Sequence, residues 1–138
     1  ALSRFLTQVY PNLETVQRLV YAPDLIKISE DLVGFVELTL DGPLLVSMSS
    51  FSAMNMICLA LLGAYVGYRL GKTSRETLSS NELARITGKA RKTIMNELPK
   101  LLSRGYVERT SESEYLITTL GIKRTEKMVE DFRAEVKS

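Results

Sequence analysis

The chain has 138 residues, of which 45% are hydrophobic and 25% are charged, a balance typical of one or two small globular domains with a buried core. It contains no histidine and one cysteine, Cys58, which excludes histidine-based acid–base catalysis, disulfide frameworks and the common zinc sites. The net charge of +2 is unevenly distributed, because residues 72–109 hold nine basic and four acidic side chains while the rest of the chain is acidic.

No group of residues supports catalysis or the binding of a metal or cofactor. Paired carboxylates at useful spacing and a glycine-rich phosphate loop are both missing, so an enzyme is not expected. The N-terminus lacks a basic stretch followed by an apolar run, which predicts no signal peptide and a cytoplasmic location.

Residues 1–48 are predicted to form an N-terminal segment of helices followed by a hairpin. Residues 2–9 and 13–20 have helical spacing, with Pro11 between them and Pro23 ending the second. Residues 24–32 fit either a strand or a helix, since Leu25, Ile28 and Leu32 also have helical spacing.

A turn signal, Asp41-Gly42-Pro43, separates two strand-like runs. A three-residue loop over these positions places the apolar residues on one face, whereas a two-residue loop mixes the faces. The three-residue register is therefore predicted, with Leu40 opposite Leu44, Leu38 opposite Val46 and Val36 opposite Met48.

Residues 50–70 form the most hydrophobic segment of the chain. The uninterrupted apolar run covers only residues 56–66, less than the roughly 20 residues of a membrane helix, so a buried helix is predicted. Gly63, Gly67 and Gly71 recur every four residues. They indicate either a close helix–helix or dimer contact, or room for packing inside one domain with Gly71 ending the helix.

Residues 79–105 carry the signals of two short helices joined by a tight turn. Ser79 or Ser80 is expected to cap a helix over 81–87, and Gly88 to end it. A second helix is expected from about Ala90 to Gly105. Its core face would consist of Ile94, Leu98, Leu101 and Leu102.

Two short strands and a final helix complete the predicted elements. Residues 106–109 and 115–118 are rich in β-formers and flank a polar connection over 110–114, which indicates a hairpin. Residues 119–136 form an amphipathic helix with an apolar stripe. That stripe packs either on its own domain or against a second copy. Its members are Ile122, Thr125, Met128, Val129, Phe132 and Val136.

Residues 51–136 resemble the winged helix-turn-helix family of small prokaryotic transcription regulators, as in the MarR, PadR and ArsR groups. The matching positions are Glu82-Leu83-Ala84, Thr87-Gly88, Thr93-Ile94, Leu98, Leu101, Gly105-Tyr106-Val107-Glu108-Arg109, Tyr115-Leu116-Ile117-Thr118 and Gly121. The resemblance implies an α+β, mainly α, fold with a winged helix-turn-helix domain over residues 49–138. Residues 1–48, for which no resemblance is found, would serve dimerisation or sensing.

The resemblance also implies a DNA-binding surface on the second helix. Arginine and lysine neutralise phosphates or contact guanine, and asparagine pairs with adenine. The implied contact residues are Lys89, Arg91, Lys92, Thr93, Met95, Asn96, Lys100 and Arg104.

Two features depart from the family pattern. The predicted wing tip carries Glu112 and Glu114, which would repel phosphates. Pro99 lies within the predicted recognition helix, where it removes one backbone hydrogen bond. The helix either kinks near Met95 or breaks, with Pro99 beginning a second helix.

The sequence therefore predicts a sequence-specific reader of double-stranded DNA, a transcription regulator acting as a homodimer. The alternative is a winged-helix module that binds protein within a transcription, replication or chromosome-handling assembly. The acidic wing favours the alternative, and the basic run over residues 89–92 opposes it.

Overall fold

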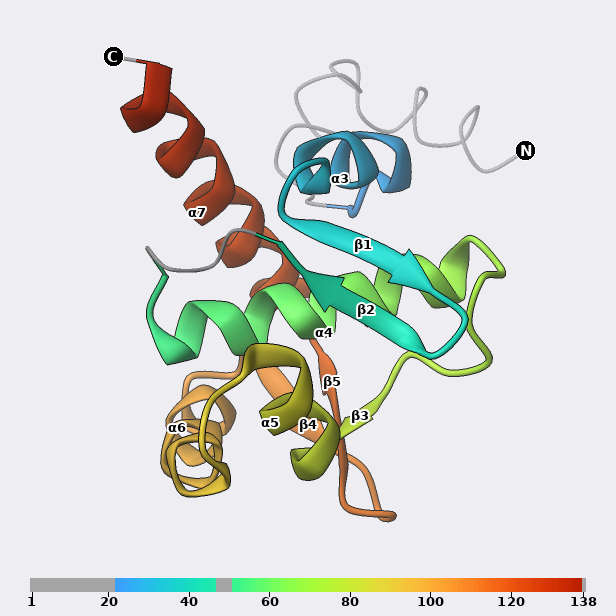
Figure 1. The fold of residues 1–138 in the computed structure, drawn as a ribbon, viewed down its shortest axis with the longest axis vertical. Coiled ribbons are helices and arrows are strands. Elements are labelled where there is room, and N and C mark those ends of the chain that lie inside the picture. The colour runs from blue at the N-terminus through green and yellow to red at the C-terminus, as the bar shows by residue number, and fades with distance from the viewer. Residues whose placement is uncertain (1–21, 47–50, 138) are drawn as a thin grey trace, which may run out of the picture.

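The computed structural model describes residues 22–46 and 51–137, and these form an α+β fold that is mainly helical (Figure 1). The helices predicted over residues 2–9 and 13–20 lie outside the described residues. In chain order the described elements are α3 (Leu25–Leu32), β1 (Val36–Thr39), β2 (Gly42–Leu45), α4 (Ala53–Arg69), β3 (Leu78–Ser79), α5 (Ser80–Thr87), α6 (Arg91–Ser103), β4 (Val107–Arg109), β5 (Glu114–Ile117) and α7 (Thr119–Lys137).

Helix α4 is the centre of the fold, as expected for the most apolar segment. Every residue of its apolar run, 56–66, is buried except Tyr65, which is half-buried. Figure 1 shows α3 and the β1–β2 hairpin on one side of α4, with α5 and α6 on the other. Across residues 22–46 and 51–137, no helix is both long and apolar enough to cross a membrane.

The predicted register of the β1–β2 hairpin is wrong. Val36 lies opposite Leu45 and Leu38 opposite Pro43, so the two-residue turn is Leu40–Asp41. Pro43 is buried in strand β2. The apolar face is thereby built from Val36, Leu38, Pro43 and Leu45, whereas Leu40 is 92% exposed at the turn.

Two of the recurring glycines make room for this hairpin within the chain. A Cβ on Gly63 would lie 2.8 Å from Val36 Cγ1 and 2.9 Å from Pro43 Cβ, and one on Gly67 would lie 3.3 Å from the Thr73 side chain. Gly71 follows the helix end in a left-handed conformation, with a φ of +75°. The amides of Gly71 and Lys72 donate to the carbonyls of Tyr68 and Gly67, as in a Schellman motif. The packing explanation of the glycines is therefore confirmed.

A small sheet and helices α5 and α6 lie on the other side of α4 (Figure 1). The strand order is β3-β5-β4, all antiparallel. Strand β3 consists of two residues and was not predicted. Helices α5 and α6 begin and end within about two residues of their predicted limits.

Helix α3 settles the ambiguity of residues 24–32, because Asp24 caps a helix there and Ile28 and Leu32 are buried. Its Lys27 Nζ lies 2.7 Å from Glu130 Oε1 on α7.

The apolar stripe of α7 packs on its own chain. Ile122, Thr125 and Val129 are buried and Met128 is half-buried, while the side chain of Val136 lies outside the described residues. The ring of Phe132 contacts the rings of Phe35 and Phe51 at centroid distances of 5.5 Å and 4.8 Å. The described residues of the N-terminal segment and the C-terminal helix thus share one hydrophobic core.

Candidate nucleic-acid interface

Helices α5 and α6 are joined by a three-residue turn, Gly88–Ala90, whose conformation follows from local signals. Ser79 and Glu82 form a capping box at the start of α5. Gly88 ends α5 in the left-handed region, with a φ of +71°. At the start of α6 the cap residue is Ala90, whose side chain makes no capping hydrogen bond. Among the described residues, no side chain caps the first amides of α6, which leaves a positive helix end available to an anion.

The two faces of α6 divide as predicted. Ile94, Leu98 and Leu101 are buried against the core, and Leu102 is half-buried. Of the predicted contact residues, Thr93 is half-buried and the others are exposed: Lys89, Arg91, Lys92, Met95, Asn96, Lys100 and Arg104.

The predicted residues fall into two groups along the helix. Lys89, Arg91, Lys92, Thr93, Met95 and Asn96 occupy the turn and the first two turns of α6. Lys100 lies further along, with Nζ 3.3 Å from Glu97 Oε1. Arg104 follows the end of α6, about 20 Å from Arg91 at 1.5 Å per residue, and its guanidinium contacts Met54 Sδ at 3.5 Å.

The basic side chains at the start of α6 have no acidic partner among the described residues. Within residues 22–46 and 51–137, Lys89, Arg91 and Lys92 form no salt bridge or side-chain hydrogen bond. They are exposed and adjoin the uncapped amides, so their positive charges add to the positive electrostatic potential at the N-terminal end of the helix.

Pro99 does not break α6, which runs without interruption from Arg91 to Ser103. Its ring is exposed on the helix surface. Of the two alternatives open from the sequence, a second helix beginning at Pro99 is excluded.

The β4–β5 connection is less acidic than its sequence indicates. It consists of Thr110–Ser113, because Glu114 already belongs to β5 and is half-buried. The amide of Thr110 donates to the carbonyl of Glu114 at 2.8 Å. On the preceding strand, the guanidinium of Arg109 donates to Ser113 Oγ at 3.0 Å. Glu112 is therefore the one acid in this connection, and the prediction that the tip carries two acids is corrected.

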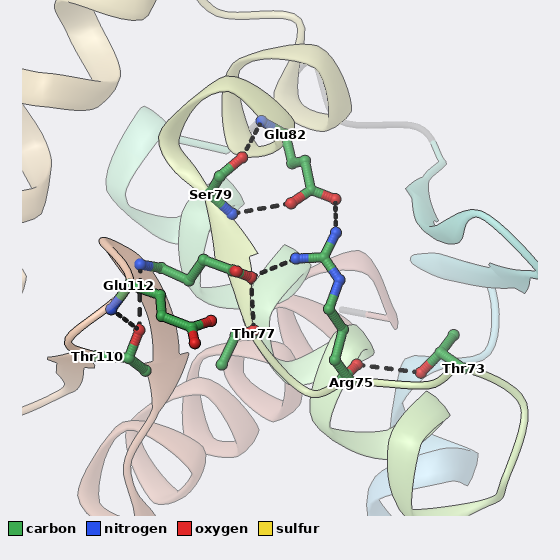
Figure 2. A network of polar contacts seen from close by, with 8 residues as sticks. Thr73, Arg75, Thr77, Ser79, Glu82, Thr110 and Glu112 are labelled. Atoms are coloured by element: carbon green, nitrogen blue, oxygen red, sulfur yellow. Dashed lines mark hydrogen bonds and ion pairs between the residues drawn. The ribbon is translucent and has the colours of Figure 1, made fainter.

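Arg75 accounts for the position of Glu114, and Figure 2 shows the Arg75 guanidinium turned toward Glu82. Its guanidinium forms one ion pair with Glu114 and a second with Glu82, the latter at 2.6 Å. The hydroxyl of Thr77 also donates to Glu114, at 2.7 Å. Burial acts to raise the pKa of Glu82, but hydrogen bonds from the Ser79 amide and from Arg75 outweigh it and lower that pKa. Arg75 was not among the predicted site residues, because Glu114 lies 39 positions away in the sequence.

Cys58 is buried in α4, and its burial raises the pKa of the thiol. The described ranges contain no cluster of three or more histidine, cysteine or acidic residues that could hold a metal ion.

Comparisons of the chain with protein-family models, with curated proteins and with solved structures give no match.

Proposed function

We propose that residues 51–137 form a winged helix-turn-helix that binds double-stranded DNA through α6, and that the protein is a dimeric transcription regulator of the prokaryotic type. In this assignment α5 and α6 are the helix-turn-helix and the β4–β5 hairpin is the wing. The order of α4, β3, α5, α6, β4, β5 and α7, with the strand order β3-β5-β4, supports it.

One observation carries the proposal. Three basic side chains, Lys89, Arg91 and Lys92, surround the exposed and uncapped start of α6 and have no acidic partner among the described residues. Phosphate oxygens fit such a site in both charge and hydrogen bonding. Asn96 lies exposed on the same helix and supplies an amide suited to an adenine edge.

The test is the salt dependence of duplex binding by wild type and by a double variant, Arg91→Ala with Lys92→Ala. Each lost phosphate contact lowers the slope of log affinity against log salt by about 0.9, so the double variant should bind more weakly with a slope lower by about 1.8. A matched control replaces Lys72 and Lys127 by Ala. It removes the same charge from the loop after α4 and from α7, and should leave the slope near that of wild type.

The second candidate function is protein binding by the same fold. It is favoured by Glu108 and Glu112, two exposed acids on the wing that would be repelled by phosphates. If wild type fails to bind duplex DNA even at low salt, or if the double variant and wild type have equal affinity at every salt concentration, the DNA assignment is wrong and protein binding becomes the better explanation.

A further inference from the structure

The Arg75 side chain joins three parts of the chain that lie far apart in the sequence. Arg75 itself belongs to the connection between α4 and β3, Glu82 to the first turn of α5, and Glu114 to the start of β5. Figure 2 shows the Arg75 guanidinium turned toward the Glu82 carboxylate, and the same guanidinium pairs with Glu114. Since both carboxylates bond the same guanidinium, they lie within a few ångströms of one another, and without Arg75 their like charges would repel.

Glu114 also determines where the wing begins. Its carbonyl accepts the Thr110 amide, which closes the β4–β5 connection, and its own amide donates to Thr110 Oγ1. On the other side, β5 is held to β3 by only two residue pairs, Leu78 with Tyr115 and Ser79 with Glu114. A pairing this short is weak by itself. The ion pairs of Arg75 therefore add a side-chain link between the base of the wing and α5.

We propose that Arg75 is a positioning residue that holds the wing at a fixed orientation to the helix-turn-helix, acting through Glu114. The proposal rests on the proposed DNA-binding function. Arg75 does not contact DNA in this arrangement, because its guanidinium is bound to two carboxylates. Loss of Arg75 releases the wing and leaves Glu82 and Glu114 uncompensated.

A substitution at Glu114 distinguishes two explanations of the role of Arg75, its positive charge and its positioning of the wing. The two explanations predict opposite changes in DNA affinity. If charge alone matters, removing the Glu114 carboxylate strengthens DNA binding and removing the Arg75 guanidinium weakens it. If Arg75 acts by positioning the wing, Glu114→Thr weakens binding although it removes a negative charge. Threonine keeps the strand preference of the position but is too short to reach Arg75.

The experiment compares full-length wild type with Arg75→Met, Glu114→Thr and the double variant. We expect each single variant to lose about five- to tenfold in duplex affinity, and the double variant to lose no more than either, since both break the same link. The matched control is Lys72→Met, which removes the same charge three residues away and should lose less. Thermal melting should change little in all variants, because the Arg75 side chain is 48% exposed and water screens its ion pairs, although the Glu82 and Glu114 side chains are 21% and 22% exposed.

Hydrogen exchange of the Thr110 amide in the free protein separates this proposal from the proposed function. We expect faster exchange in Arg75→Met and Glu114→Thr, and unchanged exchange in Lys72→Met. If wild type does not bind DNA but the exchange changes appear, the DNA function fails and the positioning role of Arg75 stands. The positioning role is overturned if Glu114→Thr binds DNA as tightly as wild type or more tightly, or if Thr110 exchange is the same in all the proteins.

Discussion

The first turn of α7 lies directly against the chain that leaves α6, and Gly121 is the residue that allows this approach. A Cβ at Gly121 would lie 2.1 Å from the carbonyl oxygen of Tyr106, a backbone atom that cannot move aside freely. Thr118 strengthens the same junction, because its hydroxyl donates to the Gly105 carbonyl at 2.6 Å and accepts from the Gly121 amide at 3.0 Å. The close packing of α7 on the chain that leaves α6 thus explains why a glycine is needed at Gly121.

We predict that Gly121→Ala destabilises the protein by about 2 kcal/mol or more, because the clash exceeds the roughly 1 kcal/mol that alanine gains over glycine in a helix. The matched control is Gly67→Ala, another glycine within a helix, whose Cβ would meet only side chains, Thr73 at 3.3 Å and Leu38 Cδ2 at 3.6 Å. That variant should stay within about 1 kcal/mol of wild type, since a side chain yields more easily than backbone. Urea unfolding measures both changes. Equal stability of Gly121→Ala and wild type would contradict the packing explanation.

At the scale of the elements, the helices were predicted well because their ends depend on local signals. The Ser79–Glu82 capping box and the left-handed Gly88 each act within a few residues, so α5 and the turn after it can be inferred from the sequence. The buried positions of α6 can also be inferred from the sequence, because its apolar residues recur with the 3.6-residue period of a helix.

The elements that were missed or misplaced depend on distant partners. The β1–β2 register is set by the packing of Pro43 on Gly63, which no local pattern contains. Strand β3 is only two residues long and exists through its pairing with β5. Arg75, in the connection before β3, pairs with Glu114 at the start of β5. This pairing is not visible in the sequence, so Glu114 was predicted to lie at the wing tip.

Pro99 lies in the third turn of α6, where its ring leaves the Met95 carbonyl without the usual helical donor. We predict that Pro99→Ala restores this hydrogen bond and raises stability by up to about 2 kcal/mol, after the greater freedom of the unfolded chain is subtracted. We also expect duplex affinity to fall, because removing a proline reduces the bend of a helix and would turn Lys100 and Arg104, which lie beyond it, in another direction. Thermal melting and a binding titration check the two effects, and a lower melting temperature would contradict the stability argument.

On the scale of the whole molecule, six of the eight large exposed apolar side chains of the described residues lie outside α6 and α7, and the other two are Met95 on α6 and Leu120 on α7. Two faces that the sequence offered for dimerisation are already covered within the chain, since the hairpin lies on Gly63 and Gly67, and Phe132 packs on Phe35 and Phe51. Large exposed apolar residues remain on α3, the hairpin and the end of α4. They are Ile26, Val33, Leu40, Leu44, Tyr68 and Leu70.

Val33 and Leu70 belong to one apolar surface, because both line a small cavity of about 80 Å³ together with Leu38. Figure 1 shows α3 and α6 on opposite sides of α4. A two-fold contact through the α3 side would therefore leave α6 of both protomers free, which suits a regulator that reads a two-fold DNA site.

We predict that the protein is a homodimer in solution, with twice the chain mass of 15.5 kDa by light scattering at a concentration on the order of tens of micromolar. Leu70→Asp, which introduces a charge into an exposed apolar surface, should shift the mass to that of a monomer while the far-ultraviolet circular dichroism stays unchanged. Leu120→Asp is the matched control. Leu120 is 52% exposed and Leu70 is 45% exposed, so the two side chains are similarly accessible, but Leu120 lies in the first turn of α7 beside Gly105 and not on the α3 side. The control should remain a dimer. A monomer mass for wild type would contradict the dimer prediction. If the Leu70→Asp variant is still a dimer, the dimer contact lies on another face.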